Sequence, residues 1–294
     1  MNRPSRALCA LLLAALLLSL CPAARAAEAA APYAPPEGMW EVRVYVDGLL
    51  SGRALADYGG VWLAAEDLCA LVGIETSTLW NEERGELSVG GRGFVLHAVE
   101  GQPYFSVNSR YLYEPLGFFR HDERSWFPAE DISRIFGGEL SVSDDATRVD
   151  LKSEALSVMP GGAAWYYDNF GSAEIFWLAR IIHSEAGGQP IAGRIGVGNV
   201  VLNRVASDRY PDKIFDVVFD DQYAVQFDPA YTGAVYQEPG EEDVICACLC
   251  FEGYNTVGES MFFVNPKRAN DSWFRNTKEF VITIGDHDFY KIPG

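Results

Sequence analysis

The clearest hydrophobic pattern in the chain lies between residues 172 and 188. Its apolar positions recur three and four residues apart, at Ile175, Leu178, Ile181 and Ile182. This spacing predicts a helix with one buried face. Ser172 is the expected N-cap of that helix, and Gly187 and Gly188 are expected to end it.

Glu185 lies in the last turn of this predicted helix and on its buried face, three residues after Ile182. Its carboxyl group is expected at the edge of an apolar pocket and near the negative end of the helix dipole. Both surroundings raise the pKa of a carboxyl group. A glutamate that stays protonated at neutral pH is the general acid of glycosidases. The alternative is a solvated residue at a fraying helix end, because perturbed carboxylates only enrich for active sites.

The first half of the chain has a strand-like pattern instead. Valines alternate with polar residues over 42–46 and predict a strand. Two later segments, 62–73 and 126–137, share the pattern Trp-(Leu/Phe)-(Ala/Pro)-Ala-Glu-Asp and end in glycine, at a constant offset of 64 residues. In each segment the Ala-Glu-Asp step is expected to open a short helix, and strands are expected at 86–89 and 148–151.

The second half is predicted to be mainly helical. Pro190 fits the first turn of a helix that is expected to run to about Arg204. Three glycines within it are costly for a helix and predict close backbone contact, with the Glu185 helix as the expected partner: Gly193, Gly196 and Gly198. The later elements are expected as a helix at 211–219, a polar loop walling a cleft at 220–240, a helix at 241–254, and strands at 261–264 and 280–284.

These patterns predict an α+β chain of several parts. A short basic start, an apolar run too short to span a membrane and an Ala24-Arg25-Ala26 cleavage pattern predict a signal peptide. We therefore expect secretion to the cell wall, without stable membrane insertion. The expected boundaries are the signal peptide at 1–27, a tether at 28–39, a small α+β domain with an internal duplication at 40–152, a linker at 153–171 and a mainly helical domain at 172–294.

Acidic residues outnumber basic ones, which argues against polyanionic binding partners. The chain has 41 acidic and 23 basic residues, and loss of residues 1–27 would remove three arginines and no acid, leaving 20 basic residues and a net charge of −21. Such a surface argues against charge-driven binding of nucleic acid or polyanionic wall polymers.

Four cysteines follow the predicted signal peptide: Cys69, Cys246, Cys248 and Cys250. The last three lie in one predicted helix, and no histidine stands nearby to complete a tetrahedral zinc site. Cys246, Cys248 and Cys250 are therefore expected as small buried apolar residues, and no metal or cofactor is expected.

Residues 40–152 resemble the copper amine oxidase N-terminal-like domain, a stalk module of secreted bacterial proteins. The paired Trp-(Leu/Phe)-(Ala/Pro)-Ala-Glu-Asp segments carry this resemblance. It implies a spacer or wall-contact module and no catalysis.

Residues 173–291 resemble the SleB/CwlJ-type cell-wall hydrolases, which include spore-cortex-lytic enzymes. Four motifs carry this resemblance in order: LARIIHSEAGG continuing to NRV, Pro211–Phe219 leading to Gln226-Phe227, Phe262–Pro266, and Ile284–Tyr290. The resemblance implies a lysozyme-like domain that cuts the glycan strands of peptidoglycan, in spore cortex or vegetative wall. The family's catalytic glutamate falls on Glu185, and Asp228 stands where the family often has serine.

The resemblance also suggests where the glycan binds. The expected substrate-binding residues are Gln226, Phe227, Phe262, Asn265, His287 and Tyr290. The two amides would bond sugar hydroxyls or N-acetyl groups, and the aromatic rings would stack on pyranose faces. Core packing of the three aromatics, a turn role for Asn265 and a structural role for His287 are the alternatives.

Glu185 is expected to protonate the glycosidic oxygen between MurNAc and GlcNAc, after which water or the MurNAc 6-hydroxyl completes the reaction. Hydrolysis of the usual kind needs a second carboxylate. The acids of the predicted loop stand in no motif and are expected to be solvated: Asp220, Asp221, Asp228 and Glu238. A lone acid favours lytic transglycosylation, with a muramidase as the alternative.

Two further classes of protein compete with this interpretation. A zinc amidase is disfavoured because His183 and Glu185 would lie roughly 200° apart around the helix and could not share an ion. A non-catalytic wall-binding protein is disfavoured by the retained Glu185.

Overall fold

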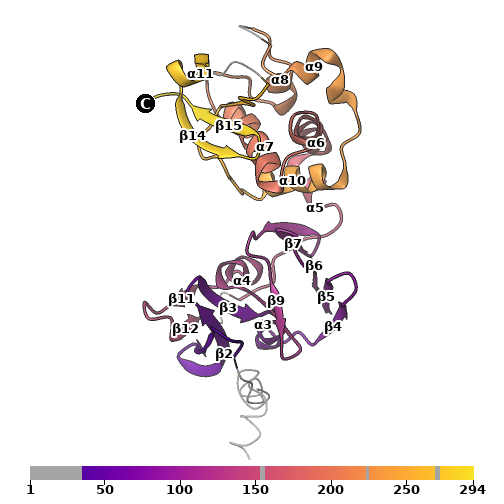
Figure 1. Ribbon diagram of the computed structural model, residues 1–294. Coiled ribbons are helices and arrows are strands. Elements are labelled where there is room, and N and C mark those ends of the chain that lie inside the picture. Colours follow the sequence, from indigo (N-terminus) through magenta and orange to yellow (C-terminus); the bar gives the residue numbers. More distant parts are fainter. Residues whose placement is uncertain (1–34, 153–155, 223–224, 269–271) are drawn as a thin grey trace, which may run out of the picture. The chain divides into compact units, whose positions relative to one another are not determined.

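The computed structural model describes residues 35–152, 156–222, 225–268 and 272–294 (Figure 1). The predicted signal peptide lies outside the described residues. None of the described helices combines the length and the apolar character needed to span a bilayer. The chain divides into two compact units: a first unit of residues up to Ser109 with Glu114–Gly161, and a second unit of Arg110–Tyr113 with Gly162–Gly294.

The first unit contains a mixed sheet of seven strands in the order β11-β12-β1-β2-β3-β10-β9. These strands are β1 (Trp40–Val46), β2 (Leu49–Asp57), β3 (Gly60–Ala64), β9 (Phe119–His121), β10 (Arg124–Pro128), β11 (Leu140–Val142) and β12 (Arg148–Leu151). β1 and β12 run parallel, and the other neighbouring pairs recorded for this sheet are antiparallel. The predicted alternation in β1 is confirmed, because Val42, Val44 and Val46 are all buried.

Both repeated segments form a strand followed by a short helix. β3 leads into α3 (Ala65–Leu71), and β10 leads into α4 (Ala129–Phe136), so the predicted helix starts are confirmed. Gly137 ends α4 in the left-handed conformation, at φ 63°. β3 and β10 pair antiparallel with Leu63 opposite Phe127, and these two residues are equivalent positions of the repeat.

A second antiparallel sheet follows α3 in the chain. Its strands β4 (Thr76–Asn81), β5 (Glu86–Gly91), β6 (Phe94–Val99) and β7 (Tyr104–Val107) pair in sequential order. β8 (Arg110–Tyr113) is counted with the second unit. The strands predicted at 86–89 and 148–151 are both confirmed, and the α+β class holds for the chain as a whole.

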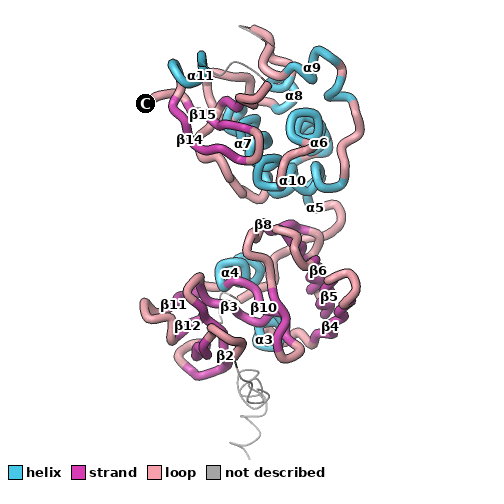
Figure 2. The backbone as a smooth tube through the Cα atoms, in the orientation of Figure 1, coloured by secondary structure: helices cyan, strands magenta, loops and turns pink. Residues whose placement is uncertain are grey.

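The second unit is mainly helical, with one small sheet (Figure 2). Its helices are α5 (Trp165–Phe170), α6 (Ser172–Ala186), α7 (Ile191–Val205), α8 (Ile214–Val218), α9 (Asp228–Thr232), α10 (Glu241–Phe251) and α11 (Ser272–Thr277), with a 3-10 turn at Ala234–Tyr236. The sheet has the order β13-β15-β14, with β13 (Phe262–Val264), β14 (Glu279–Ile284) and β15 (His287–Lys291). α6 packs against α7 and α10.

α6 is the helix that the hydrophobic spacing predicts. Its four apolar positions are all buried, as predicted. Its N-cap is Gly171 rather than Ser172, because the chain turns at Gly171 with a positive φ of 85° that favours glycine. Gly187 is the C-cap, as predicted.

The segment predicted as a polar loop at 220–240 contains more regular structure than expected. α9 and the 3-10 turn both lie within it. A helix of five residues is too short to give a readable hydrophobic period, which explains why the sequence alone indicated a loop. α11 and β15 were also not predicted as separate elements.

The glycines of α7 allow close packing, as predicted, but against more than one partner. A Cβ at Gly198 would lie 2.6 Å from Cys250 Sγ and 3.0 Å from Ile182 Cδ1, so this glycine contacts both α10 and α6. A Cβ at Gly196 would lie 2.8 Å from Val257 Cγ1, away from α6.

All four described cysteines are free and buried, and burial was predicted for Cys246, Cys248 and Cys250. Desolvation by burial is the first cause that raises the pKa of each thiol, which disfavours the reactive thiolate. They act as small apolar core residues.

Candidate active site

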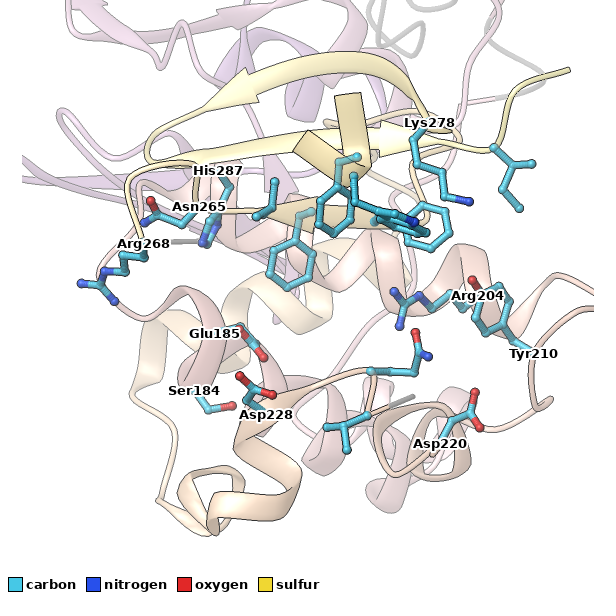
Figure 3. Close-up of a pocket in the computed structure, with 18 of the residues that line it drawn as sticks. Ser184, Glu185, Arg204, Tyr210, Asp220, Asp228, Asn265, Arg268, Lys278 and His287 are labelled. Carbon is cyan, nitrogen blue, oxygen red and sulfur yellow. The ribbon is translucent and has the colours of Figure 1, made fainter. Parts of the chain in front are cut away.

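The second unit contains a cavity of about 890 Å³ beside the end of α6 (Figure 3). Polar, charged and aromatic side chains line it together. The lining residues are Ser184, Glu185, Arg204, Arg209, Tyr210, Asp220, Val225, Gln226, Asp228, Phe262, Phe263, Val264, Asn265, Arg268, Trp273, Phe274, Lys278, His287 and Ile292. They come from α6, α7, α9, α11, the small sheet and the segments between them, so the cavity depends on the packing of most of the unit.

Glu185 lines this cavity from the last turn of α6, as its place on the buried face predicts. Burial is the largest cause that raises its pKa to about 7, and the negative charge of Asp228 raises it further. The positive charge of Arg204 opposes this shift. A substantial fraction of Glu185 is therefore protonated near neutral pH, as a general acid must be.

Arg204 is the most deeply buried cation in the cavity wall. It is 4% exposed, and its Nε donates a hydrogen bond to the Met261 carbonyl oxygen at 2.8 Å. Its guanidinium carbon lies 4.9 Å from the centre of the Phe227 ring and 5.2 Å from that of Tyr210. Within the described residues, Nη1 has no hydrogen-bond partner. Burial lowers the pKa of Arg204, but the side chain still supplies the positive charge that partly offsets the two carboxylates.

Four of the six predicted substrate-binding residues line the cavity: Gln226, Phe262, Asn265 and His287. The other two lie in the core. Phe227 is 1% exposed and packs against Phe263, and Tyr290 is 2% exposed and packs against Phe274 and Phe280. Their burial leaves almost no ring surface open to a sugar, so the structure favours the core-packing alternative for both.

Asn265 and His287 have structural roles as well as a place in the wall. Asn265 Oδ1 accepts a hydrogen bond from the Lys267 backbone N–H at 3.0 Å, which is the turn role considered for it. His287 is 6% exposed, and its ring centre lies 5.2 Å from that of Phe263. Burial lowers the pKa of His287 and favours the neutral imidazole. No partner for its Nδ1 occurs in the described part of the chain.

The sequence interpretation gave no site role to several residues that line the cavity. Arg204 follows Val200 and Val201 at helical spacing, and a charge on a buried helix face was a usable signal. Trp273 lies on the unpredicted helix α11 and had no such signal. Asp228 was considered only as one of four loop acids, and its place opposite Glu185 depends on how α9 folds back to α6 (Figure 3).

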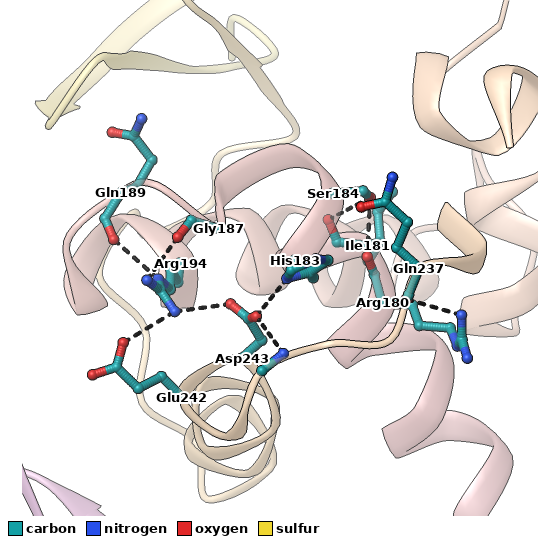
Figure 4. Close-up of polar contacts among 11 residues, drawn as sticks. Arg180, Ile181, His183, Ser184, Gly187, Gln189, Arg194, Gln237, Glu242 and Asp243 are labelled. Atoms are coloured by element: carbon teal, nitrogen blue, oxygen red, sulfur yellow. Dashed lines mark hydrogen bonds and ion pairs between the residues drawn. The ribbon is translucent and has the colours of Figure 1, made fainter. Parts of the chain in front are cut away.

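A network of polar contacts outside the cavity lining holds the end of α6 (Figure 4). Arg194 donates hydrogen bonds to the carbonyl oxygens of Gly187 and Gln189, at 2.7 and 3.0 Å, and to Asp243 Oδ1 at 2.9 Å. Asp243 Oδ2 lies 2.7 Å from His183 Nδ1. His183 is thus engaged with Asp243 rather than lining the cavity with Glu185, as the helical angle between them predicts. Among the residues described, no group of three or more His, Cys, Asp or Glu side chains is arranged to hold a metal ion.

Part of the second unit is similar in sequence to known proteins. Residues 188–290 match the family described as Cell Wall Hydrolase. Glu185 lies three residues before the matched segment. The spore cortex-lytic enzyme of Bacillus subtilis is 27% identical over 139 residues, which cover 47% of this chain and 42% of that protein. That of Halalkalibacterium halodurans is 28% identical over 145 residues, which cover 49% of this chain and 41% of that protein.

Two solved structures are also similar to part of this chain. The catalytic domain of the germination-specific lytic transglycosylase SleB from Bacillus anthracis is 26% identical, with a TM-score of 0.38 over 42% of this chain and 98% of that domain. The catalytic domain of the Bacillus cereus SleB protein is 28% identical, with a TM-score of 0.37 over 40% of this chain and 89% of that one. This chain spans less than half the length of the curated relatives named above. The matched family and the curated relatives support the predicted relationship to SleB-type cell wall hydrolases for the C-terminal half of the chain.

Proposed function

We propose that the second unit cleaves the glycosidic bond between MurNAc and GlcNAc in peptidoglycan, with Glu185 as the general acid. One observation carries this proposal: the Glu185 carboxyl group lines a cavity of about 890 Å³, within the usual range of ligand pockets, with its pKa raised to about 7. The similarity of the C-terminal half to cell wall hydrolases supports the substrate class.

In the proposed reaction, Glu185 donates its proton to the glycosidic oxygen as the bond breaks. The resulting carboxylate then accepts a proton from the nucleophile that attacks the anomeric carbon. If the nucleophile is the MurNAc 6-hydroxyl, the reaction is lytic transglycosylation and leaves a 1,6-anhydro end. If it is water, the reaction is hydrolysis and leaves a reducing end.

Glycan binding is proposed for the remaining wall of the cavity. Phe262 and Trp273 present aromatic surface on which pyranose rings can stack, with ring centres 6.4 Å apart. Gln226 and Asn265 supply amide groups for sugar hydroxyls or N-acetyl groups. This arrangement combines apolar faces with a small number of polar groups, as ligand pockets commonly do.

We further propose secretion to the wall, with spore cortex or vegetative peptidoglycan as the substrate. The first unit is proposed as a spacer or wall-contact module of the amine oxidase N-terminal-like kind. Neither proposal affects the chemistry at Glu185.

The test is digestion of purified peptidoglycan by the full mature chain, with wild type beside Glu185→Gln. Glutamine keeps the shape of the neutral carboxyl group but has no acidic proton, so we expect cleavage to fall by about 10²- to 10⁴-fold with unchanged folding. The control is Glu259→Gln, which removes an exposed carboxylate outside the cavity lining and should retain wild-type cleavage. Unchanged cleavage by Glu185→Gln would reject this mechanism.

The same preparation tests the two competing classes. A non-catalytic wall-binding protein would sediment with peptidoglycan but release no muropeptides. A zinc amidase would contain stoichiometric zinc and release free stem peptides without cutting the glycan strand.

A further inference from the structure

Asp228 lies beside the proposed acid in the lining of the cavity. It is the first residue of α9, while Glu185 lies in the last turn of α6. Both side chains line the same cavity, and Figure 3 shows their carboxyl groups pointing toward each other. Asp228 is therefore placed to act on the same substrate bond as Glu185.

A buried neighbour fixes this position. Phe227, directly before Asp228, packs against Phe263 with ring centres 6.2 Å apart and lies under the Arg204 guanidinium. The Phe227 carbonyl oxygen accepts a hydrogen bond from the Ala230 N–H at 3.1 Å, which closes the first turn of α9. The backbone on both sides of Asp228 is therefore held, and its exposed side chain lines the cavity.

The other acids of this segment have different surroundings. Glu238 forms an ion pair with Arg180. Asp221 interacts with the Tyr231 hydroxyl group. Asp220 lines the cavity near Tyr210, further from Glu185 than Asp228 in Figure 3, and its Oδ1 accepts the Gln222 N–H at 3.1 Å. In the described part of the chain, no hydrogen bond or ion pair engages the Asp228 carboxylate, so its lone pairs are available to a water molecule.

We propose that Asp228 is a second catalytic carboxylate, which accepts a proton from a water molecule that attacks the MurNAc anomeric carbon. This inference rests on the proposed function. The water oxygen forms a bond to the anomeric carbon while the glycosidic bond breaks. Glu185 gives its proton to the leaving GlcNAc 4-oxygen, and Asp228 takes one proton from the water. The net reaction consumes one water molecule and leaves a reducing MurNAc end.

This assignment changes the expected product. The sequence favoured lytic transglycosylation because a lone acid leaves the sugar's own 6-hydroxyl as the nucleophile. Two carboxylates on one substrate bond are instead the arrangement of glycoside hydrolases. Repulsion by Asp228 also helps Glu185 to keep its proton, so each carboxylate has a separate task.

The experiment measures which end each cut produces. Peptidoglycan is digested with wild type, Asp228→Ser, Asp228→Asn and the control Asp216→Asn, an exposed carboxylate of α8 outside the cavity lining. Borodeuteride reduction labels reducing MurNAc ends and leaves 1,6-anhydro ends unlabelled, so mass spectrometry gives the ratio of the two. Serine is the informative replacement because it removes the carboxylate and leaves a small polar side chain.

We expect reducing ends from the wild type and from Asp216→Asn, and a shift of at least tenfold toward 1,6-anhydro ends in Asp228→Ser. The assignment would be overturned if the wild type produced exclusively 1,6-anhydro ends, or if Asp228→Ser left the ratio of the two ends unchanged. Either result would leave the role of Glu185 intact. If Asp228→Ser cuts no bonds, Asp228→Ala is assayed with sodium azide, a nucleophile that needs no base. Formation of MurNAc azide then supports the assignment, and its absence overturns it.

A failure of the proposed function itself would look different from these results, because the wild type would then cut no glycan bond.

Discussion

Arg194 Nη1 lies 2.9 Å from Asp243 Oδ1, and this ion pair joins the first turn of α7 to the start of α10. Both side chains are largely buried. Arg194 also donates to two carbonyl oxygens that follow α6, at Gly187 and Gln189, where cations are favoured by the helix dipole. The pair therefore fixes the helix end that carries the acid, without facing the cavity itself.

Removal of one partner of this pair should be costly. Asp243→Asn leaves the Arg194 charge without its buried partner, so we expect the free energy of unfolding to fall by about 3–5 kcal/mol in urea titrations. Glu242→Gln is a matched control, because Glu242 also pairs with Arg194, at 3.2 Å, but its side chain is far more exposed. The control should lose less than about 1 kcal/mol. Equal losses from the two variants would contradict this account.

The raised pKa of Glu185 makes the stability of the protein depend on pH. In the unfolded chain its pKa is near 4.5, and in the folded protein it is about 7. Between these values the folded state binds more protons than the unfolded state, so stability falls as pH rises from about 4.5 to 7, by at most about 3 kcal/mol. Glu185→Gln cannot ionise and should escape this loss.

The measurement is the difference in melting temperature between Glu185→Gln and wild type at several pH values. We expect a small difference near pH 4.5 and a growing advantage for the variant up to pH 8. Glu259→Gln, at an exposed carboxylate, should show no such trend. A difference that stays constant with pH would mean that the buried carboxyl group titrates normally.

The same pKa should set the alkaline limit of the proposed activity. In the proposed mechanism cleavage needs protonated Glu185, so kcat/KM should fall as pH rises through about 7. Asp228→Asn removes a negative charge that holds the proton on Glu185, so the alkaline limb should move to lower pH. Asp216→Asn should leave the limb in place. An alkaline limb that is unchanged in Asp228→Asn would show that the two carboxylates do not interact.

The substitution Gly198→Ala tests the close packing of α7. An alanine Cβ there would lie 2.6 Å from Cys250 Sγ in a fully buried contact, and such overpacking costs about 1–3 kcal/mol. The gain in helix propensity is about 1 kcal/mol, so a net loss of stability is expected in thermal unfolding of Gly198→Ala. The double variant Gly198→Ala/Cys250→Ala should recover part of it, whereas Gly188→Ala, with open space around it, should be nearly neutral. If the double variant recovers no stability, the contact with Cys250 is not the source of the strain.

Much of the local structure followed from the sequence, because hydrophobic period is a property of one element at a time. The spacing around Glu185 located α6 and the face on which the acid lies. The alternating valines located β1, and the Ala-Glu-Asp steps located the starts of α3 and α4. The angle between His183 and Glu185 on one helix was equally predictable, and the two side chains do have different surroundings.

What the sequence could not determine is which distant residues share the cavity with Glu185. The side chains of Phe227 and Tyr290 look suited to sugars in a motif, but packing against Phe263 and Phe274 buries them. Asp228 stands among four acids of similar appearance, and only the return of α9 toward α6 distinguishes it from Glu238, which pairs with Arg180. The physical reason is that periodicity specifies the buried face of an element, whereas the neighbours of that face depend on how separate elements pack together.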